Sequence, residues 1–556
     1  MEIHMSQFLA LTQTGCRRLI SRRLLQRLTT SPFLLLAVAV LQAVLPATVN
    51  AAPKKPNIVL VMADDMGYSD LGCYGSEIRT PHVDSLAAGG LRFRQFYNNS
   101  VCGPTRASLL TGLYCQQIGH SGRHWNQPKD FSKCVTIAEV LQHSGYRTMM
   151  VGKWQGRDLA VRRGFDRFFG PNCQAKISYF DEVEMNPYSL NNQPWKVPQD
   201  DFFMTDAFID HAVEFLDEAS KADKPFFLYV AYIAPHWPLH ARERDIASYR
   251  STYRQTGWDE WRATRFAQQR ETGLLKPSWE LSPKPAGVPA WQDDKHKDWQ
   301  AERMAAYAAQ VSAVDTGVGR VLESLRKTNS EENTLVMFLS DNGAAPNGGI
   351  GPTTSGFGFG PNAKNDKWRL DGAAIKPGSG PENMPGPHDT FAAYGLAWCN
   401  VSNTPLRGEK SSAWEGGIRT PLIVRWPEVI RERGRFTDDV GHVIDVMATC
   451  LDVAQTPYPE QFHNRRPLPL EGKSLLPTFR GREREGHEVL CWSVPGNQAI
   501  RMGDWKLVSA ARGKPWQLYD LAADATETTN LASRHPERVQ EMTREFQQWE
   551  KRVGAK

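Results

Sequence analysis

The sequence lacks the cysteine patterns of small metal-binding and redox proteins. Its nine cysteines are scattered over 556 residues, with no C-x-x-C pair and no zinc-like spacing. A zinc finger or a thioredoxin-like redox motif is therefore excluded as the basis of the fold. An exported chain can form disulfides, but the sequence does not pair these cysteines, and a chain of this length can bury a core without them.

A strong charge of either sign is also absent. The formal net charge is +5, and most of the excess lies in residues 1–51, which hold five arginines and one acid. Without that segment the Lys and Arg total falls from 66 to 61 and the Asp and Glu total from 61 to 60. The remaining chain therefore has no overall attraction for nucleic acid or for an anionic membrane.

No apolar run is long enough to cross a bilayer comfortably. The longest, residues 33–45, is shorter than the roughly 20 residues that a spanning helix needs. It follows a basic stretch and precedes a small-residue cleavage pattern at residues 49–51 (VNA). We predict that residues 1–51 are a signal peptide, with a membrane anchor as the alternative. The mature protein is then periplasmic or secreted and has no integral membrane segment.

Four short apolar runs predict buried parallel strands. They cover residues 57–63, 147–151, 225–233 and 334–340. Helical patterns at residues 137–143, 206–219 and 303–325 precede the second, third and fourth runs. This alternation predicts an α/β fold in which a large, mostly parallel or mixed sheet is sandwiched by helices.

The C-terminal part of the chain has a different pattern. Short strands are predicted at residues 488–493, 498–501 and 506–509, followed by a charged amphipathic helix at residues 536–553. We therefore predict a large domain over residues 52–485 and a small α+β subdomain over residues 486–556. The subdomain is expected to hold an antiparallel sheet and the terminal helix.

Two segments of the large domain are open to more than one interpretation. Residues 239–300 are rich in Trp, Arg and Pro, and they either line a pocket for a ring-shaped substrate or pack as helices. Residues 344–400 are rich in Gly, Pro and Asn and predict a long loop system. Such a loop either borders an active site or runs over the surface.

Polar side chains follow the four predicted strands directly or within a few residues. They are Asp64 and Asp65, Lys153, His236, and Asp341 and Asn342. Ligand sites of open α/β sheets lie beyond the carboxyl ends of the strands. If the four strands share one sheet, these side chains meet at one edge and form a site.

The segment from Cys102 to Gly112, CGPTRASLLTG, resembles the signature of the type I sulfatases, formylglycine-dependent members of the alkaline phosphatase superfamily. Residues 56–65, 145–154, 234–236, 340–343 and 404–421 resemble further blocks of that family in the same order. The last block contains Lys410, and residues 388–403 resemble the arylsulfatase branch. The resemblance covers nearly the whole mature chain.

The resemblance implies that a maturation enzyme oxidises Cys102 to formylglycine. A hydrated aldehyde carries two hydroxyls, of which one attacks the sulfur of a sulfate ester and displaces the alcohol. The other is then deprotonated and expels sulfate. The implied substrate is an aryl sulfate, another sulfated small molecule or a sulfated carbohydrate.

The family's functional residues map onto this chain. The implied metal ligands are Asp64, Asp65, Cys102, Asp341 and Asn342, whose oxygen donors favour Ca²⁺, with Mg²⁺ as the second choice. Arg106, Lys153 and Lys410 are implied to neutralise the sulfate group, and His236, with Lys410, to protonate the departing alcohol.

One position departs from the family pattern, because Gln155 stands where the family has a histidine that serves as base for sulfate release. A glutamine amide forms hydrogen bonds but cannot take up a proton at neutral pH. Either His120 or His124 replaces the base, or release is slow, or the chain is a degenerate, non-catalytic protein that binds sulfated ligands. A phosphodiesterase or phosphonate monoester hydrolase of the same superfamily is a further alternative.

Overall fold

The structure is a computed structural model that describes residues 54–120, 131–156, 159–171, 177–182, 186–198, 200–346, 376, 380–494 and 496–555. Residues 55–556 form one compact unit. The predicted signal peptide at residues 1–51, His124 and most of the predicted loop system at residues 344–400 lie outside the described residues. The predicted domain boundary between residues 485 and 486 stays a prediction.

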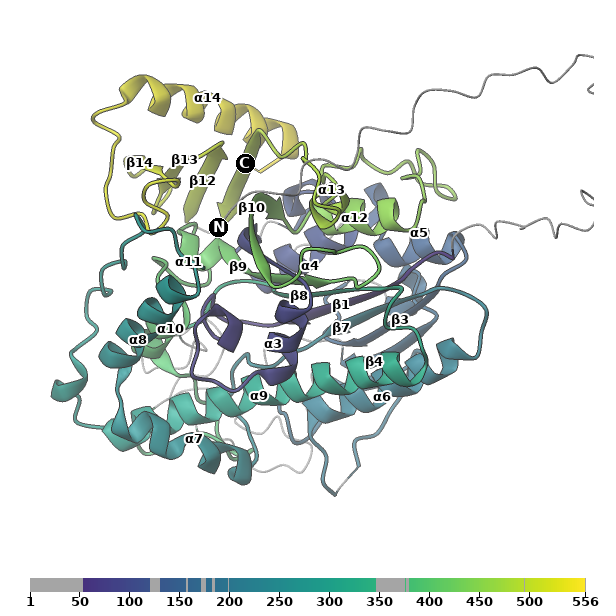
Figure 1. The fold of residues 1–556 in the computed structure, drawn as a ribbon, viewed down its shortest axis with the longest axis horizontal. Coiled ribbons are helices and arrows are strands. Elements are labelled where there is room, and N and C mark those ends of the chain that lie inside the picture. The colour runs from purple at the N-terminus through teal and green to yellow at the C-terminus, as the bar shows by residue number, and fades with distance from the viewer. Residues whose placement is uncertain are drawn as a thin grey trace, which may run out of the picture. The chain divides into compact units, whose positions relative to one another are not determined.

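One large mixed sheet runs through the described part of the chain, in the strand order β10-β2-β9-β8-β1-β7-β3-β4-β5-β6 (Figure 1). Its strands are β1 (Asn57–Ala63), β2 (Leu91–Tyr97), β3 (Arg147–Gly152), β4 (Arg167–Pro171), β5 (Tyr188–Leu190), β6 (Gln193–Pro194), β7 (Phe226–Ala231), β8 (Thr334–Ser340), β9 (Arg419–Arg425) and β10 (Arg435–His442). The four predicted strands are β1, β3, β7 and β8. They are adjacent and parallel, as the order β8-β1-β7-β3 shows.

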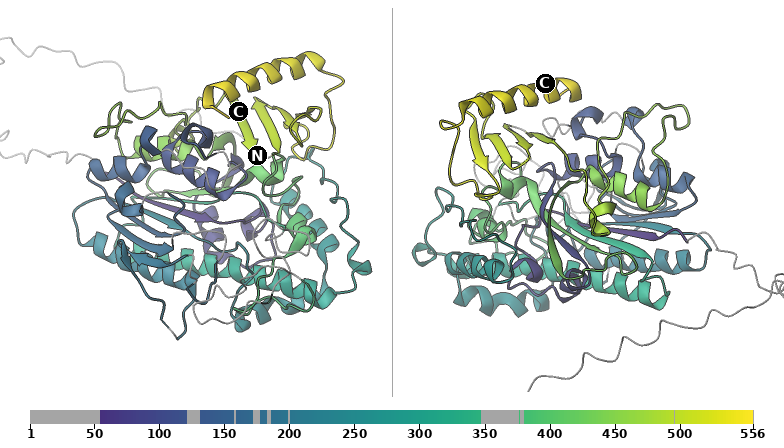
Figure 2. Two further views of the ribbon diagram at one scale, coloured as in Figure 1. Left: turned by 180° about the vertical axis from the view of Figure 1, so that it is seen from behind. Right: turned by 45° about the horizontal axis from the view of Figure 1, so that its top comes forward.

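Helices cover both faces of this sheet (Figures 1 and 2). One layer contains α3 (Pro81–Ala88), α6 (Met204–Ser220), α7 (Glu243–Gln255), α8 (Trp258–Glu271) and α9 (Lys297–Lys327); the other contains α4 (Cys102–Thr111), α5 (Ile137–His143), α12 (Asp445–Val453) and α13 (Leu476–Phe479). Short helices α10 (Gly395–Ser402) and α11 (Glu415–Ile418) lie in the connections. Single 3-10 turns occur at Gly72–Tyr74, Cys115–Ile118, Phe131–Lys133, Ala160–Arg163 and Trp291–Asp293. No described helix combines the length and apolarity that crossing a membrane requires.

The position of β1 between two helical layers explains why its apolar residues do not alternate with polar ones. Val59 and Val61 belong to the core beneath α6 and α9, whereas Ile58, Leu60 and Met62 belong to the core beneath α5 and α12. Successive side chains of a strand point to opposite faces, so a strand covered on both faces must be apolar throughout. The α/β fold predicted from these runs is therefore confirmed.

The pattern of apolar runs did not reveal the mixed half of the sheet. Strand β2 pairs antiparallel with β9 and parallel with β10, and β9 pairs antiparallel with β8. Arg92 and Arg94 interrupt the apolar pattern of β2, and their guanidinium groups lie over the ring of Phe436, at 3.8 and 4.8 Å from its centroid. A long cationic side chain can pack its stem on an apolar surface. Arginines can therefore occupy this strand, and their charges hide its apolar pattern in the sequence.

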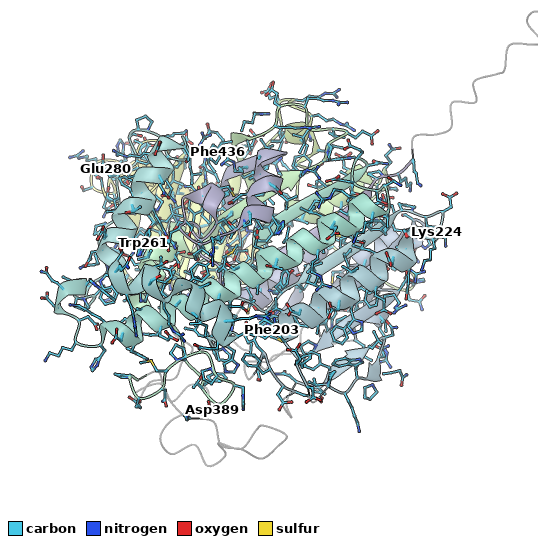
Figure 3. The ribbon with its side chains drawn as sticks, turned by 60° about the horizontal axis from the view of Figure 1, so that its bottom comes forward. Phe203, Lys224, Trp261, Glu280, Asp389 and Phe436 are labelled. Carbon is cyan, nitrogen blue, oxygen red and sulfur yellow. The ribbon has the colours of Figure 1, made fainter. Side chains whose placement is uncertain are left out.

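The aromatic segment at residues 239–300 packs as helices. Trp258 begins α8, and its ring meets those of Trp291 and Trp398 edge to face at 4.7 and 5.7 Å. Trp279 is fully buried. Figure 3 views this helical layer from below and labels Trp261, also on α8. Of the two interpretations of this segment, the packing one is supported.

A second, antiparallel sheet closes the chain, as predicted. It has the order β11 (Val489–Val494), β12 (Asn497–Met502), β13 (Trp505–Ser509) and β14 (Gln517–Asp520). The terminal helix α14 (Pro536–Val553) covers it, and Met542, Phe546 and Trp549 join its core (Figure 2). Strand β14 was not predicted; its four residues, QLYD, have a polar residue at each end.

A fully buried charge cluster joins this small sheet to the large one. Lys506 on β13 contacts Glu415 at 2.8 Å and Glu527 at 2.7 Å, and none of the three side chains is exposed. Glu415 also accepts a hydrogen bond from Tyr97 on β2 at 2.8 Å. Because Glu415 begins α11, directly after the loop that carries Lys410, the cluster also anchors that loop.

This cluster predicts a pH-dependent stability. Burial, reinforced by Glu415 and opposed by Lys506, raises the pKa of Glu527 from 4.5 to about 7. In this pH range the folded protein holds a proton that the unfolded chain releases. The free energy of unfolding should therefore fall as the pH rises from about 5 to about 7, by up to about 1.4 kcal/mol per pH unit. In thermal unfolding across this range, Glu527→Gln should flatten the slope and the exposed Glu488→Gln should not. An unchanged slope in Glu527→Gln would contradict the assignment.

Candidate active site

The predicted site residues meet at the carboxyl edge of the parallel strands. Ala63 at the end of β1 is in register with Ser340 at the end of β8, and Gly152 at the end of β3 with Ala231 at the end of β7. The loops that follow are interlocked through their backbones, because Asp341 donates to the Ala63 carbonyl at 3.1 Å. The sheet therefore brings together acids, a lysine and a histidine that lie far apart in the sequence.

Glycine at position 152 allows β3 to turn into this edge. Its φ is +97°, and a Cβ there would lie 2.0 Å from the carbonyl oxygen of Ala231. Only glycine combines that backbone conformation with so close an approach. Lys153 follows at once, and its backbone N–H donates to the same carbonyl at 2.7 Å.

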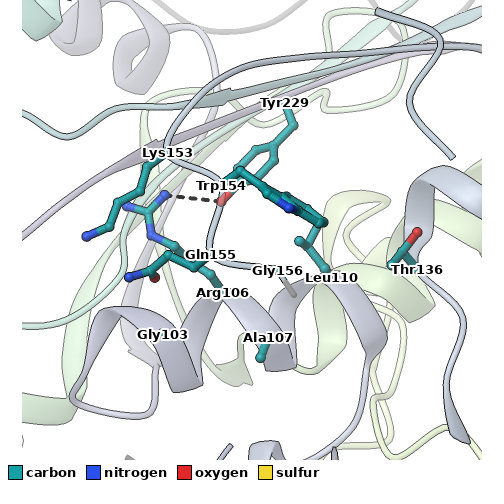
Figure 4. A pocket seen from close by; sticks show the side chains of 10 residues that line it. All are labelled: Gly103, Arg106, Ala107, Leu110, Thr136, Lys153, Trp154, Gln155, Gly156 and Tyr229. Atoms are coloured by element: carbon teal, nitrogen blue, oxygen red, sulfur yellow. Dashed lines mark hydrogen bonds between the residues drawn. The ribbon is translucent and has the colours of Figure 1, made fainter. Parts of the chain in front are cut away.

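Cys102 is the first residue of α4, where unpaired N–H groups and the helix dipole favour a negative charge. It is 4% exposed, and the amide nitrogen of Gln155 lies 3.6 Å from its sulfur. Arg106 follows one turn later on the same helix. Figure 4 shows Arg106, Lys153 and Gln155 lining one pocket over α4, with the hydrogen bond from Arg106 to Tyr229 as a dashed line.

Arg106 links α4 to two acids of the sheet edge. Its Nε and Nη2 contact Asp341 at 2.9 and 2.8 Å, and Nη2 lies 3.6 Å from Asp64. Nη2 also donates to the carbonyl of Tyr232 at 3.2 Å. Lys153 donates to the same Asp64 carboxylate. Two buried cations thus face Asp64 and Asp341.

Asp65 is the centre of a second group. Lys410 and the side-chain amide of Asn342 donate to its Oδ1 at 2.5 and 2.7 Å, and His236 Nε2 lies 3.5 Å from its Oδ2. Lys410 reaches this point because its backbone bonds to the carbonyl of Ala344 at 2.9 Å. The hydrogen bond from the Asp65 N–H to Asp341 Oδ1 joins the two groups, so the contacts connect the predicted site residues other than Cys102, whose sulfur contacts Gln155.

The acids of the site differ in proton affinity. Burial disfavours the charge of Asp64, but Lys153, His236 and Arg106 outweigh burial and lower its pKa. Burial, reinforced by Asp64 and Asp65, raises the pKa of Asp341 to about 7. Like charges held close together in low dielectric push one carboxyl toward its neutral form. A bound cation would relieve this repulsion.

The bases of the site differ as well. Burial lowers the pKa of His236 to about 4, against the opposing effect of Asp65. Burial also works against the charge of Lys410, but Asp65 outweighs it and raises the pKa of Lys410. At neutral pH, in the protein alone, His236 is therefore neutral and Lys410 is charged.

Three buried oxygens of the site have the character of cation ligands. Within the described residues, Asp64 Oδ1, Asp65 Oδ2 and Asn342 Oδ1 accept no hydrogen bond. A buried acceptor without a donor is costly, and a bound cation would satisfy it. Ligand atoms of Asp64, Asp65 and His236 also lie within 4.8 Å of one another. Of the predicted ligands, Asp341 instead contacts Arg106, and its Oδ1 accepts from the Asp65 N–H at 3.3 Å.

Residues 56–456, which include every predicted site residue, match the family described as Sulfatase. The chain belongs to the sulfatase family. Residues 409–552 also match the family described as N-sulphoglucosamine sulphohydrolase, C-terminal. The protein is accordingly a sulfate ester hydrolase, and its fold is the sulfatase fold.

This sulfatase resembles several known relatives over most of its length. An uncharacterized sulfatase of Schizosaccharomyces pombe is 30% identical over 91% of this chain and 95% of the relative. An arylsulfatase of Klebsiella aerogenes is 28% identical over 76% of this chain and 92% of the relative. The crystal structure of Ps i-CgsB in complex with k-i-k-neocarrahexaose is 27% identical, covers 89% of this chain and 93% of that one, and has a TM-score of 0.63.

Sequence reasoning missed two contributors to this site. Tyr229 was not predicted as a site residue because it lies inside the apolar run of β7. Its hydroxyl nevertheless lies 3.4 Å from Arg106, and burial raises the pKa of Tyr229 to about 12. Gly103 is the second: the imidazole of His120 occupies the space where a side chain at position 103 would stand. A hydroxyl within an apolar strand is the signal that could have identified Tyr229.

Proposed function

We propose that this sulfatase hydrolyses sulfate esters through formylglycine at position 102, with a divalent cation held by the acids around Asp64 and Asp65. The observation that carries the proposal is the position of Cys102. It begins α4, and its sulfur lies 3.6 Å from the amide nitrogen of Gln155, which lines a pocket together with Arg106 and Lys153. An exported location and a separate maturation enzyme, which would supply the oxidant for Cys102, stay predictions.

Arg106, Lys153 and Lys410 are proposed to hold the sulfate group. They are buried or nearly so, and acids already orient all three. Cations fixed in advance in a low-dielectric site stabilise developing negative charge without reorganisation, which is often the largest catalytic contribution. The sulfate would replace part of the negative charge that these cations now face.

His236, with Lys410, is proposed to protonate the departing alcohol. His236 is neutral in the protein alone, but a bound sulfate ester adds negative charge, which favours the protonated imidazole. Its Nδ1 is 2.5 Å from the carbonyl of Trp237, which holds Nε2 toward Asp65 and the site. Lys410, with its raised pKa, supplies a charged donor beside it.

The residues present fit a hard divalent cation. Asp64, Asp65 and Asn342 offer unsatisfied oxygens, Asp341 is the further acid of the predicted set, and residue 102 would add an oxygen after oxidation. Such a donor set favours Ca²⁺, with Mg²⁺ as the alternative. The cation would polarise the sulfate group and lower the pKa of a hydroxyl bound to it.

We expect Ca²⁺ to raise the melting temperature of the chelator-treated protein and to restore its activity. A ligand at a hundredfold excess over its Kd stabilises a folded protein by about 2.7 kcal/mol. Asp65→Asn should abolish the Ca²⁺-dependent shift in thermal unfolding, whereas the exposed control Asp217→Asn should keep it. A shift with Mg²⁺ but not with Ca²⁺ would identify Mg²⁺ as the ion that the site binds. No shift with either ion would contradict the cation site.

The proposed substrate class is a sulfated carbohydrate or an aryl sulfate. Relatives support both, since N-acetylgalactosamine-6-sulfatase of Canis lupus familiaris is 25% identical over 86% of this chain, and an arylsulfatase is among the similar proteins. The structure of Ps i-CgsB with a neocarrahexaose supports a carbohydrate. Paired kinetics on matched sulfate and phosphate esters separate this proposal from a phosphoester or phosphonate hydrolase.

The experiment that tests the nucleophile is mass spectrometry of the tryptic peptide from Gln95 to Arg106, from protein made in a maturation-competent host. An aldehyde in place of the Cys102 thiol is expected. A persistent thiol, in a host that matures a control sulfatase, would contradict the formylglycine proposal.

A further inference from the structure

We propose that His120 is the base that releases sulfate from this enzyme and so replaces the histidine missing at Gln155. The inference rests on the proposed formylglycine chemistry. It starts from a chemical requirement, because the second half-reaction needs a group that accepts a proton from a hydroxyl on Cβ of residue 102. Gln155 lies 3.6 Å from the Cys102 sulfur but has no basic atom.

His120 lies against the residue that follows the nucleophile. A Cβ at Gly103 would stand 2.6 Å from Cε1 and 2.7 Å from Nε2 of the His120 ring, and 3.7 Å from Oε1 of Gln155. The imidazole and the Gln155 amide therefore approach the same side of Gly103, next to Cys102. The Gln155 side chain lies close to Cys102 and to the space above Gly103, where the imidazole lies, so we infer that it orients a hydroxyl of residue 102 toward the imidazole.

The chain holds His120 in this position. The 3-10 turn Cys115–Ile118 follows α4, and the backbone N–H of His120 donates to the carbonyl of Cys115 at 2.8 Å. The side chain is buried, with 7% of the residue exposed. A glycine at 103 is needed for this arrangement, since any larger residue would displace the ring. Gly103 thus provides the space that the buried His120 imidazole occupies next to residue 102.

The step balances as follows. The free hydroxyl on Cβ of residue 102 gives its proton to His120, and the electron pair of that O–H bond forms the C=O double bond. The bond from Cβ to the sulfate oxygen breaks, its electron pair leaves with sulfate, and the aldehyde is restored. No external oxidant or reductant is needed. A positioned base typically contributes about 10²- to 10⁴-fold to such a proton transfer.

The test compares His120→Ala with the wild type on a chromogenic sulfate ester, with the aldehyde at residue 102 verified in each protein. Release follows the first irreversible step, so kcat should fall by about 100-fold while kcat/KM stays constant. Rapid-quench experiments should show an unchanged burst of alcohol, and mass spectrometry should show a sulfo adduct on the 102 peptide. The exposed control His143→Ala should match the wild type.

Further variants separate a base from a structural residue. Gln155→His in the His120→Ala background should restore kcat and remove the adduct, because it places a base beside residue 102 again. Gly103→Ala, which displaces the imidazole, should accumulate the adduct. An unchanged kcat in folded His120→Ala, or an equal loss of kcat and kcat/KM without adduct, would overturn the role of His120. Active wild-type enzyme with a thiol at residue 102 would overturn the formylglycine proposal itself.

Discussion

Replacement of Cys102 by alanine should reduce kcat for sulfate ester hydrolysis by about 10⁶-fold, the loss seen when a covalent nucleophile is removed from an enzyme. Alanine has neither the thiol that maturation oxidises nor the hydroxyls of the hydrated product. The fold should persist, since Cys102 begins α4 at the edge of the core rather than within it. Steady-state kinetics and thermal unfolding of the same preparation measure both effects.

A second buried cysteine serves as the control for this variant. Cys450 on α12 is fully buried in the apolar core and contacts none of the site residues described above, so Cys450→Ala should keep activity. All the described cysteines are free thiols, so neither substitution breaks a described disulfide. Sulfatase turnover that survives in Cys102→Ala would refute covalent catalysis at this position.

Replacement of Lys506 by methionine should destabilise the folded protein by about 3–5 kcal/mol, the cost of breaking a buried ion pair from one side. The variant leaves Glu415 and Glu527 facing each other without the cation that now contacts both at 2.8 and 2.7 Å. Because Glu415 follows the loop that carries Lys410, activity at elevated temperature should fall with stability. Chemical denaturation measures the loss.

Two comparisons make this prediction specific. Lys514→Met removes an exposed lysine from the same subdomain, and its effect should stay within about 0.5 kcal/mol. Glu527→Gln in the Lys506→Met background removes one of the two carboxylates that have lost their lysine. The double variant should therefore lose less unfolding free energy than the sum of the two single variants. Strict additivity would contradict a shared cluster.

The centre of the fold could be predicted because its strands are buried on both faces. The runs at β1 and β8 are apolar apart from Asn57, Thr334 and Ser340 at their ends, and their observed bounds equal the predicted ones. Strands β2 and β10 could not be predicted in the same way. They lie near the edge of the sheet and carry charged residues whose stems, like those of Arg92 and Arg94, pack on an aromatic ring.

The candidate site was predictable in membership but not in pairing. Polar residues after the strands, the motif at Cys102 and the block that contains Lys410 gave the predicted members, but not the contributions of Tyr229 and Gly103. Nothing local, however, states that Arg106 contacts Asp341 while Lys153 contacts Asp64, or that Lys410 reaches Asp65. These pairs join residues on different elements, and only the register of the sheet and the docking of α4 decide them.

The sequence by itself determined the sulfatase motif, the order of its blocks and the buried strands, because these depend on residue type and local spacing. The tertiary structure alone decided that His120, rather than a residue next to Gln155 in sequence, lies beside Gly103. It also decided that Lys506 joins the two sheets. The physical reason is the same in both cases. Folding brings side chains that are distant in the sequence into contact, and the positions of the His120 ring and the Lys506 charge depend on tertiary packing that no local sequence pattern encodes.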